Sequence, residues 1–261
     1  QYVLVVYHYD PNAILVTALK NREKATIKRG YKKLHQRLIN CGCQPRLQVM
    51  DNKVSTILKD YYNDNGITLQ LAPPEMHRQN AAERAIRTFK DHFIAVRATC
   101  DPAFPARLWC RLLPHTEQTL NLLRQSRTQP KLSAYAWLYG TFNYTRTPIA
   151  PSGTRVLVHN KPQSRGSWQD RGTPGWYIGM APDHYRCHTV YLPHTRGTRV
   201  SDTVEFFPVT YTLPSLSARH KAIHAMQDLL QQLQSPNSNQ QLLQNYGSEY
   251  NDAIESLDKI F

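Results

Sequence analysis

Two carboxylates, Asp51 and Glu83, are the residues of this chain whose placement suggests chemistry. Asp51 follows the short apolar run 47–50, and Glu83 opens a basic segment beyond Pro73-Pro74, with 31 residues between the two carboxylates. Carboxylates that converge from separate elements can share a divalent metal, and their hard oxygen atoms favour Mg²⁺ or Mn²⁺ over zinc. Such a site would suit phosphodiester chemistry, in which one metal activates a nucleophile and another stabilises the leaving oxygen. That chemistry needs several carboxylates, and only these two are evident.

Each carboxylate also has a purely structural explanation. Asp51 could cap the helix that follows it, because Asp is a favoured N-cap residue. Glu83 would be stabilised by the helix dipole in the first turn of a helix. A basic stripe directly after Glu83 favours the functional interpretation, because Glu83, Arg87 and Lys90 recur at i, i+4 and i+7 and share one helix face.

The charge of the chain favours a polyanionic partner. The formal net charge is +13, the pI is near 9.6, and 10% of the residues are aromatic. Basic side chains interleaved with aromatic ones favour nucleic acid over a membrane surface. No run approaches the ~18 uninterrupted apolar residues of a transmembrane helix, and no signal peptide is visible. We therefore expect no membrane partner.

The cysteines do not follow the pattern of a disulfide framework or a zinc finger. Five cysteines is an odd number without framework spacing, which favours a reducing, intracellular setting. Cys41 and Cys43 form a C-x-C pair with no second pair at finger spacing, and His184, Cys187 and His188 lack a companion C-x-x-C. We expect free thiols rather than a zinc site.

The first half of the chain predicts an α/β layout. Two runs rich in β-branched and aromatic residues, 2–9 and 13–20, flank the turn sequence Asp10-Pro-Asn12 and predict a β-hairpin. Hydrophobic spacing and capping residues then predict a helix over 23–40, a strand over 46–50, a helix around 57–62, a strand over 67–71 and a long helix over 79–99. This order predicts one sheet between helices.

The composition divides the rest of the chain into two parts. Further helices are expected over 106–123, interrupted or ended near Pro114, and over 133–139. Short strands at 154–159, 176–178, 189–192 and 204–207 then alternate with turn residues. We therefore expect an α/β domain with trailing helices over 1–145, a small β-rich domain over 146–212, and a Gln-rich helical tail over 213–261 that is partly disordered.

The residues around Glu83 resemble the motif of a known enzyme family. Asp51-Asn52, followed by His77-Arg-Gln-Asn80-Ala-Ala-Glu83-Arg-Ala-Ile-Arg-Thr88, is similar to the second half of the D-D-E signature of retroelement integrases, above all those of copia-type retrotransposons. The likeness also covers 2–20, Trp109, Thr119-Leu-Asn121 and Gly175-Trp-Tyr-Ile-Gly179 with Tyr185-Arg186. It spans roughly residues 1 to 209, and its most specific part is residues 77–88.

The resemblance implies a fold and a set of roles. The fold would be a ribonuclease-H-like mixed sheet with flanking helices, and the activity would be Mg²⁺- or Mn²⁺-dependent cleavage and strand transfer during DNA integration. Asp51 and Glu83 would be the second and third metal-binding catalytic carboxylates, and Arg84, Arg87 and Lys90 would contact DNA. The partners would be element-end and target DNA, together with further copies of the chain in a homo-oligomer.

The sequence departs from the family pattern at three points. Lys53 stands where the family usually has Gly, and Ile86 replaces a common Asn. The spacing from Asp51 to Glu83 is a few residues shorter than in retroviral members, although spacing in this loop varies.

The first catalytic aspartate of the family has no counterpart in this sequence. It would lie on a strand ahead of the hairpin that starts at Tyr2, and the family's His/Cys zinc-binding domain has no counterpart either, so we expect the sequence to be N-terminally incomplete. Asp10 is a poor substitute, because the tight turn Asp10-Pro-Asn12 would leave its carboxylate facing solvent. By resemblance the first strand is central, so its absence should leave neighbouring strands without hydrogen-bonding partners.

The leading interpretation is therefore a retrotransposon integrase fragment that is intracellular, and nuclear if the host is eukaryotic. Enzymatic activity of this chain stays open, because the first aspartate is missing. The alternative is a catalytically inactive remnant that only binds DNA or protein. A sequence-specific transcription factor is disfavoured, because no helix-turn-helix or finger spacing is present.

Overall fold

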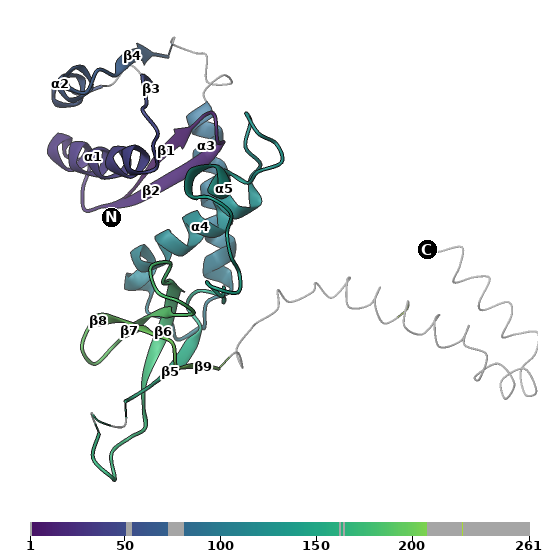
Figure 1. The fold of residues 1–261 in the computed structure, drawn as a ribbon. Helices are drawn as coiled ribbons and strands as arrows, with labels where there is room; N and C mark the ends of the chain where they lie inside the picture. The colour runs from purple at the N-terminus through teal and green to yellow at the C-terminus, as the bar shows by residue number, and fades with distance from the viewer. Residues whose placement is uncertain are drawn as a thin grey trace, which may run out of the picture. The chain divides into compact units, whose positions relative to one another are not determined.

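The computed structural model describes residues 2–50, 54–72, 81–161, 163, 165–207 and 226. All of these except Met226 belong to one compact unit, Gln1–Tyr211, and Met226 belongs to a second, Thr212–Phe261. The first unit contains helices and several sheets, so it has a mixed α/β fold (Figure 1). Apart from Met226, the predicted Gln-rich tail lies outside the described residues. No helix in the described part has both the length and the apolar character that a membrane crossing requires.

The chain starts with the predicted β-hairpin. β1 (Tyr2–His8) and β2 (Ala13–Leu19) pair antiparallel along their whole length. Asn12 adopts a left-handed backbone with φ of 59°, which Asn tolerates better than most residues. Its N–H donates to the Tyr9 carbonyl at 3.1 Å. The turn residues thus close the hairpin as the sequence predicts.

Alternation along β2 gives the hairpin two apolar faces. Ala13 and Leu15 lie in one buried cluster, and Ile14 and Val16 lie in another on the opposite side. A Cβ on Gly30 would lie 2.6 Å from a β2 side chain, so glycine allows a helix to approach the first face closely. The helices over the first face are α1 (Lys24–Asn40) and α5 (Ala134–Tyr139), and those over the second are α3 (Ala81–Ala98) and α4 (Leu113–Leu123) (Figure 1).

Helix α4 closes the outer edge of β2 with side chains instead of another strand. Asn121 accepts a hydrogen bond from the Ile14 N–H at 2.9 Å and donates one to the Ile14 carbonyl at 2.8 Å. Glu117 accepts from the Val16 N–H at 2.7 Å and pairs with the Arg37 guanidinium of α1. Both α4 side chains are buried, so they satisfy backbone groups that would otherwise be unpaired inside the protein.

A second pair of strands is parallel and shares a helical layer with the hairpin. Partly buried side chains of both strands pack on a cluster built from Tyr31, Tyr61 and Tyr62, and Leu4 and Val6 of β1 pack against the same cluster. The cluster lies on α1 and on the helix between the two strands. These elements are β3 (Leu47–Met50), α2 (Thr56–Asp64) and β4 (Thr68–Leu71).

The single sheet predicted from the sequence is not present among the described residues. β1–β2 and β3–β4 are separate two-stranded sheets, and no described strand joins them. In an antiparallel pair only every second pair of opposite residues exchanges backbone hydrogen bonds. Val5 and Tyr7 lie opposite Val16 and Ile14, whose backbone groups turn towards α4. The backbone groups of Val5 and Tyr7 therefore point to the edge of β1 away from β2, where no described strand pairs.

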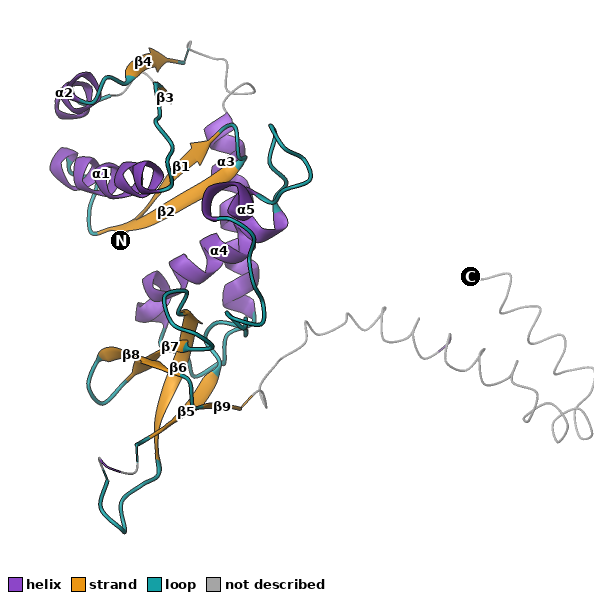
Figure 2. Ribbon diagram, viewed as in Figure 1, coloured by secondary structure: helices purple, strands orange, loops and turns teal. Residues whose placement is uncertain are grey.

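The region after α5 forms a five-stranded antiparallel sheet in the order β8-β7-β6-β5-β9 (Figure 2). β8 and β9 lie at opposite edges, although only Asp202 and Thr203 separate them in sequence. A flat sheet would place these edges about 19 Å apart, whereas the chain from Ser201 to Val204 spans at most about 11 Å. The sheet therefore curls strongly on itself. Its strands are β5 (Arg155–His159), β6 (Gly172–Met180), β7 (His188–Leu192), β8 (Gly197–Ser201) and β9 (Val204–Phe207).

The curled sheet packs on the preceding helices through aromatic side chains. Trp176 of β6 packs on the 3₁₀-helix η2 (Ala106–Leu112), and Tyr177 lies edge-on to His115 of α4 with ring centroids 5.9 Å apart. η2 passes directly into α4, whose first turn contains Pro114. The helix predicted over 106–123, with an interruption or end near Pro114, is thus a 3₁₀-helix that passes into an α-helix just before this proline. The boundary predicted at residue 145 falls within the first compact unit.

Asn121→Ala should destabilise the protein by about 2–4 kcal/mol. The substitution removes both hydrogen bonds to Ile14 and leaves a buried N–H and a buried carbonyl unpaired. Urea unfolding followed by circular dichroism measures the change. Leu123→Ala is the matched control, because Leu123 is on the same helix and 76% exposed, and it should cost less than about 0.5 kcal/mol. Equal stability of the two variants would refute the role of α4 at this edge.

Acidification should destabilise the fold through His115. Burial, reinforced by the nearby His92, lowers the pKa of His115 to about 4, whereas histidine in an unfolded chain titrates near about 6.5. Between these values the unfolded chain binds a proton that the folded chain does not. The free energy of unfolding should therefore fall by about 1.4 kcal/mol per pH unit below pH ~6.5 and level off near pH ~4.

His115→Leu should reduce this pH dependence, measured as the free energy of unfolding across the same pH series, while His8, His35, His92 and His188, whose pKa values burial also lowers, still contribute. His184→Leu replaces an exposed histidine and should retain it. A pH profile that is unchanged in His115→Leu would show that another group is responsible.

Candidate functional site

Helix α3 presents the predicted basic face to solvent. Ala85 and Phe89 are buried and anchor the helix on the β-hairpin. Residues two positions away from Ala85 lie on nearly the opposite side of a helix with 3.6 residues per turn, so Glu83 and Arg87 face outwards. The four predicted site residues on this helix are all exposed: Glu83, Arg84, Arg87 and Lys90. Their roles stay predictions.

Glu83 lies in the first turn of α3 and Arg97 in the last. The helix dipole favours a carboxylate at the first position and a cation at the second. The carboxylate that stabilises the first turn of the helix is thus the same one that is predicted to bind a metal, and the structural and functional explanations of Glu83 are compatible.

The strand that leads to Asp51 is held at its end by two contacts. The carbonyl of Met50, the last residue of β3, accepts from the Ala72 N–H at 2.8 Å, and the Tyr62 hydroxyl donates to the Met50 sulfur at 3.0 Å. Asp51 itself lies outside the described residues, as does the loop 73–80 with the first part of the motif. The position of the strand end is thus known, and the convergence of the two carboxylates stays a prediction.

The predicted carboxylates suit a hard divalent cation by their chemistry. Asp51 and Glu83 offer the oxygen ligands that Mg²⁺ and Mn²⁺ prefer. Within the described ranges, no three His, Cys, Asp or Glu side chains come together in a way that could hold a metal ion. Glu83 is the described member of the predicted pair, so metal binding stays a prediction.

Asp10 lies where the sequence predicts, in the turn between β1 and β2, with an exposed side chain. Its carbonyl oxygen accepts hydrogen bonds from the N–H groups of Arg127 and Thr128 at 3.0 and 3.3 Å. The loop after α4 therefore packs on the hairpin tip, and Asp10 contributes its backbone to that contact.

The hairpin tip carries aromatic and basic side chains that sequence reasoning missed. Arg127 lies over the Tyr9 ring, 4.5 Å from its centroid, and donates to the Tyr7 hydroxyl at 2.9 Å. Arg124 donates to the Asn12 carbonyl at 2.7 Å. The available sequence signal for this cluster was two arginines three positions apart after a helix. The aromatic side chains come from the start of the chain, and Tyr7 lies 120 residues before Arg127.

The histidines and cysteines considered as zinc ligands lie in different local environments. His188 packs against Tyr177 and Phe206, with ring centroids 5.6 and 5.2 Å away, whereas His184 is exposed. All five cysteines fall in the described part of the chain, where none of them forms a disulfide.

Comparisons with known proteins give little further information. No protein-family model and no curated protein matches the chain. Among solved structures, it is similar to a chain in the cryoEM structure of a simian T-cell lymphotropic virus intasome in complex with PP2A regulatory subunit B56 gamma. The TM-score is 0.43 and the identity 12%, over 81% of this chain and 73% of the other. A likeness this weak carries no argument about function, which has to be inferred from the chain's own residues.

Proposed function

We propose that the chain is part of a retroelement integrase, which cuts and joins DNA at phosphodiester bonds with the help of Mg²⁺ or Mn²⁺. The proposal is supported by the resemblance of residues 77–88 to the D-D-E signature. The structural observation that carries it is the exposed face of α3, where Glu83 shares a surface with Arg87 and Lys90. This face combines a carboxylate that can bind a divalent cation with basic groups that can bind phosphate.

Each group on this face has a role in the proposed reaction. When bound, the metal would activate the attacking water or 3′-hydroxyl and stabilise charge on the leaving oxygen. Asp51 and Glu83 would hold it through their carboxylate oxygens. Arg84, Arg87 and Lys90 would bind the DNA backbone, which gives affinity and strong salt dependence but little recognition of base sequence.

The edge of β1 that no described strand covers bears on the proposed reaction. A third carboxylate is needed, and the strand that would carry it has to pair beside β1 in a ribonuclease-H-like sheet. Val5 and Tyr7 direct their backbone groups to that edge. We therefore propose that the fold accepts an added strand there and that strand transfer depends on its aspartate.

The second candidate function is a DNA- or protein-binding module without catalysis. It is supported by the basic face of α3, where Arg84, Arg87 and Lys90 are exposed. Binding through the basic face of α3 is common to both candidates, so only an activity measurement separates them.

Strand transfer is the decisive measurement. The chain, extended ahead of Gln1 by a strand that carries an aspartate, should join an oligonucleotide end to a plasmid in the presence of Mn²⁺. Asp51→Asn and Glu83→Gln should each lower the rate about 100-fold or more, since a metal ligand is worth several kcal/mol in the transition state. Asp60→Asn, which neutralises an exposed carboxylate on α2, is the control and should leave the rate unchanged. Activity that survives both site substitutions would rule out the assigned carboxylates.

DNA affinity should depend on the basic face of α3 in a salt-dependent way. Arg87→Gln and Lys90→Gln should each weaken binding to duplex DNA of any sequence, and each should reduce the slope of log affinity against log salt by about 1. Fluorescence anisotropy over a salt series measures both quantities. Lys32→Gln removes an exposed charge from α1 and tests whether net charge alone matters. If this control weakens binding as much as Arg87→Gln does, α3 is not a specific contact surface.

A further inference from the structure

A tryptophan is held fully in solvent at the tip of the loop between β5 and β6. We name residues 160–171, of which the structure leaves Pro162 and Ser164 undescribed, the Trp168 loop. The Gln169 N–H donates to the Gly166 carbonyl at 3.2 Å, and the Gln169 side chain accepts from the Gly166 N–H at 2.9 Å. Trp168 lies inside the turn that these two hydrogen bonds close, and it is 101% exposed. The turn therefore presents the indole without burying either of its faces.

The exposure of Trp168 sets it apart from the other tryptophans. Trp109 and Trp137 are half-buried, and Trp176 is buried in the contact between the curled sheet and η2. An indole has two large apolar faces and contributes strongly when a partner covers them. Since Trp168 adds nothing to the core, its place on a closed turn points to a ligand with a flat apolar surface.

The Trp168 loop is basic and braced at its base. The Asn160 N–H donates to the Arg171 carbonyl at 2.8 Å, and the Arg199 guanidinium of β8 donates to the Asn160 side chain at 3.2 Å. These contacts fix the ends of the loop on the sheet. The loop contains three basic residues against one acidic residue: Lys161, Arg165, Arg171 and Asp170. A ligand of this loop therefore combines a flat surface with negative charge.

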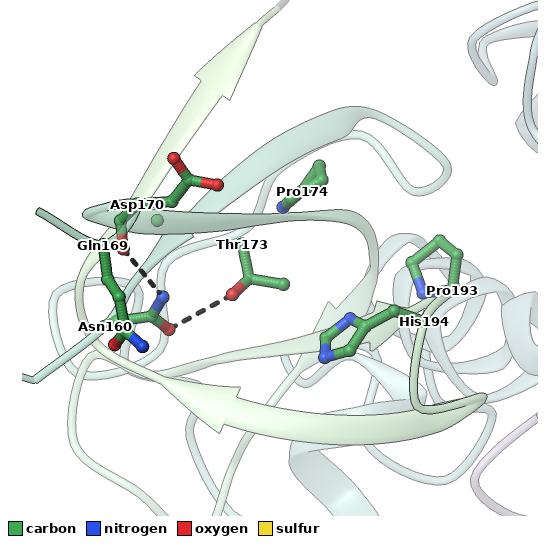
Figure 3. A pocket seen from close by; sticks show the side chains of 8 residues that line it. Asn160, Gln169, Asp170, Thr173, Pro174, Pro193 and His194 are labelled. Carbon is green, nitrogen blue, oxygen red and sulfur yellow. Dashed lines mark hydrogen bonds between the residues drawn. The ribbon is translucent and has the colours of Figure 1, made fainter. Parts of the chain in front are cut away.

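A pocket of about 440 Å³, lined by two prolines and a glycine as well as by polar side chains, opens beside the loop (Figure 3). Asn160, Gln169, Asp170 and Thr173 line it from the β5–β6 region, and His194 lines it from the β7–β8 turn. The Thr173 hydroxyl donates to the Asn160 side chain at 3.2 Å, as Figure 3 shows. Amide, carboxylate, hydroxyl and imidazole groups supply both donors and acceptors, which suits the edge of a nucleobase. The volume is within the range of small-ligand sites.

We infer that the Trp168 loop binds unpaired nucleotides of a nucleic-acid strand. One base stacks on the Trp168 indole, the basic side chains of the loop meet the neighbouring phosphates, and the pocket receives the edge of an adjacent base. Stacking platforms flanked by basic groups bind single strands in this way. Inside a duplex both faces of each base are covered by its neighbours, whereas an unpaired base leaves them open, so the ligand is unpaired. The inference rests on the proposed DNA-joining function and adds the form of DNA that is held.

The chemistry of the loop favours this ligand over a protein or a membrane. An acidic peptide would satisfy the basic side chains but offers no flat face for the indole. A membrane surface would need a wider apolar patch, whereas the residues beside Trp168 are polar: Ser167, Gln169 and Asp170. A nucleotide supplies a flat base and an anionic phosphate together, and the net charge of +13 on the chain attracts such a polyanion.

Fluorescence anisotropy with three DNA probes tests the inference: a short single strand, a blunt duplex, and the same duplex with an unpaired overhang. The full chain should bind the single strand and the overhang more tightly than a blunt end. Trp168→Ala should weaken binding to these two probes about tenfold and leave the blunt duplex unchanged, because one stacked base is lost. Trp168→Phe should restore most of the affinity, since a phenyl ring also stacks.

Tyr185→Ala is the matched control, because Tyr185 is a 66% exposed aromatic residue in another loop of the same sheet, and it should bind all three probes like the original chain. Folding of each variant is checked by its unfolding midpoint, which should not change for an exposed side chain.

The outcomes separate this inference from the proposed function. If the chain binds the blunt duplex but Trp168→Ala has no effect on the unpaired probes, or weakens all three probes equally, the inference is wrong while DNA binding stands. If the original chain binds none of the probes, the proposed function fails first and the inference fails with it.

Discussion

Asn121 and Glu117 of α4 bind the backbone of β2 at Ile14 and Val16, and the rest of the first compact unit is arranged around this contact. A helix normally packs on a face of a sheet, but here its side chains take the place of a strand at the edge. Glu117 also pairs with Arg37 and so ties α1, on the opposite face of the hairpin, to the same edge. Because the side chains are buried, these hydrogen bonds fix which edge of the hairpin is closed.

Closure of the β2 edge by α4 determines where a further strand can pair with the hairpin. With β2 sealed by α4, a further strand can join the hairpin only beside β1, where Val5 and Tyr7 direct their backbone groups. The hairpin and the parallel pair β3–β4 already share the helical layer of α1 and α2. α3 holds Glu83 at its first turn and is anchored on the other face of the hairpin. The proposed active site would therefore form where these layers and the added strand meet, because no single layer contains all of its residues.

Hydrophobic spacing and turn residues within each segment predicted most of the helices and strands. The features that were missed depend on pairing between distant segments. The hairpin, α1, α3 and the interruption near Pro114 follow from hydrophobic spacing and turn residues within each segment. β8 was missed because its only large apolar side chain is Val200, which is 43% exposed, so pairing with β7 rather than composition makes it a strand. The single sheet predicted from the sequence is not present among the described residues, where the hairpin and the pair β3–β4 form separate sheets, and spacing within a segment does not show which strands are neighbours.

The sequence by itself determined the basic charge, the order of the strands and helices other than β8, and the helical face that carries Glu83, Arg87 and Lys90, because each depends on composition or on spacing within one segment. Tertiary structure decided the closure of β2 by Asn121, since its two hydrogen bonds span 107 residues. It also decided the curl of the second sheet and the exposure of Trp168. These features arise where distant segments meet or fail to meet, and spacing along one segment holds no information about such contacts.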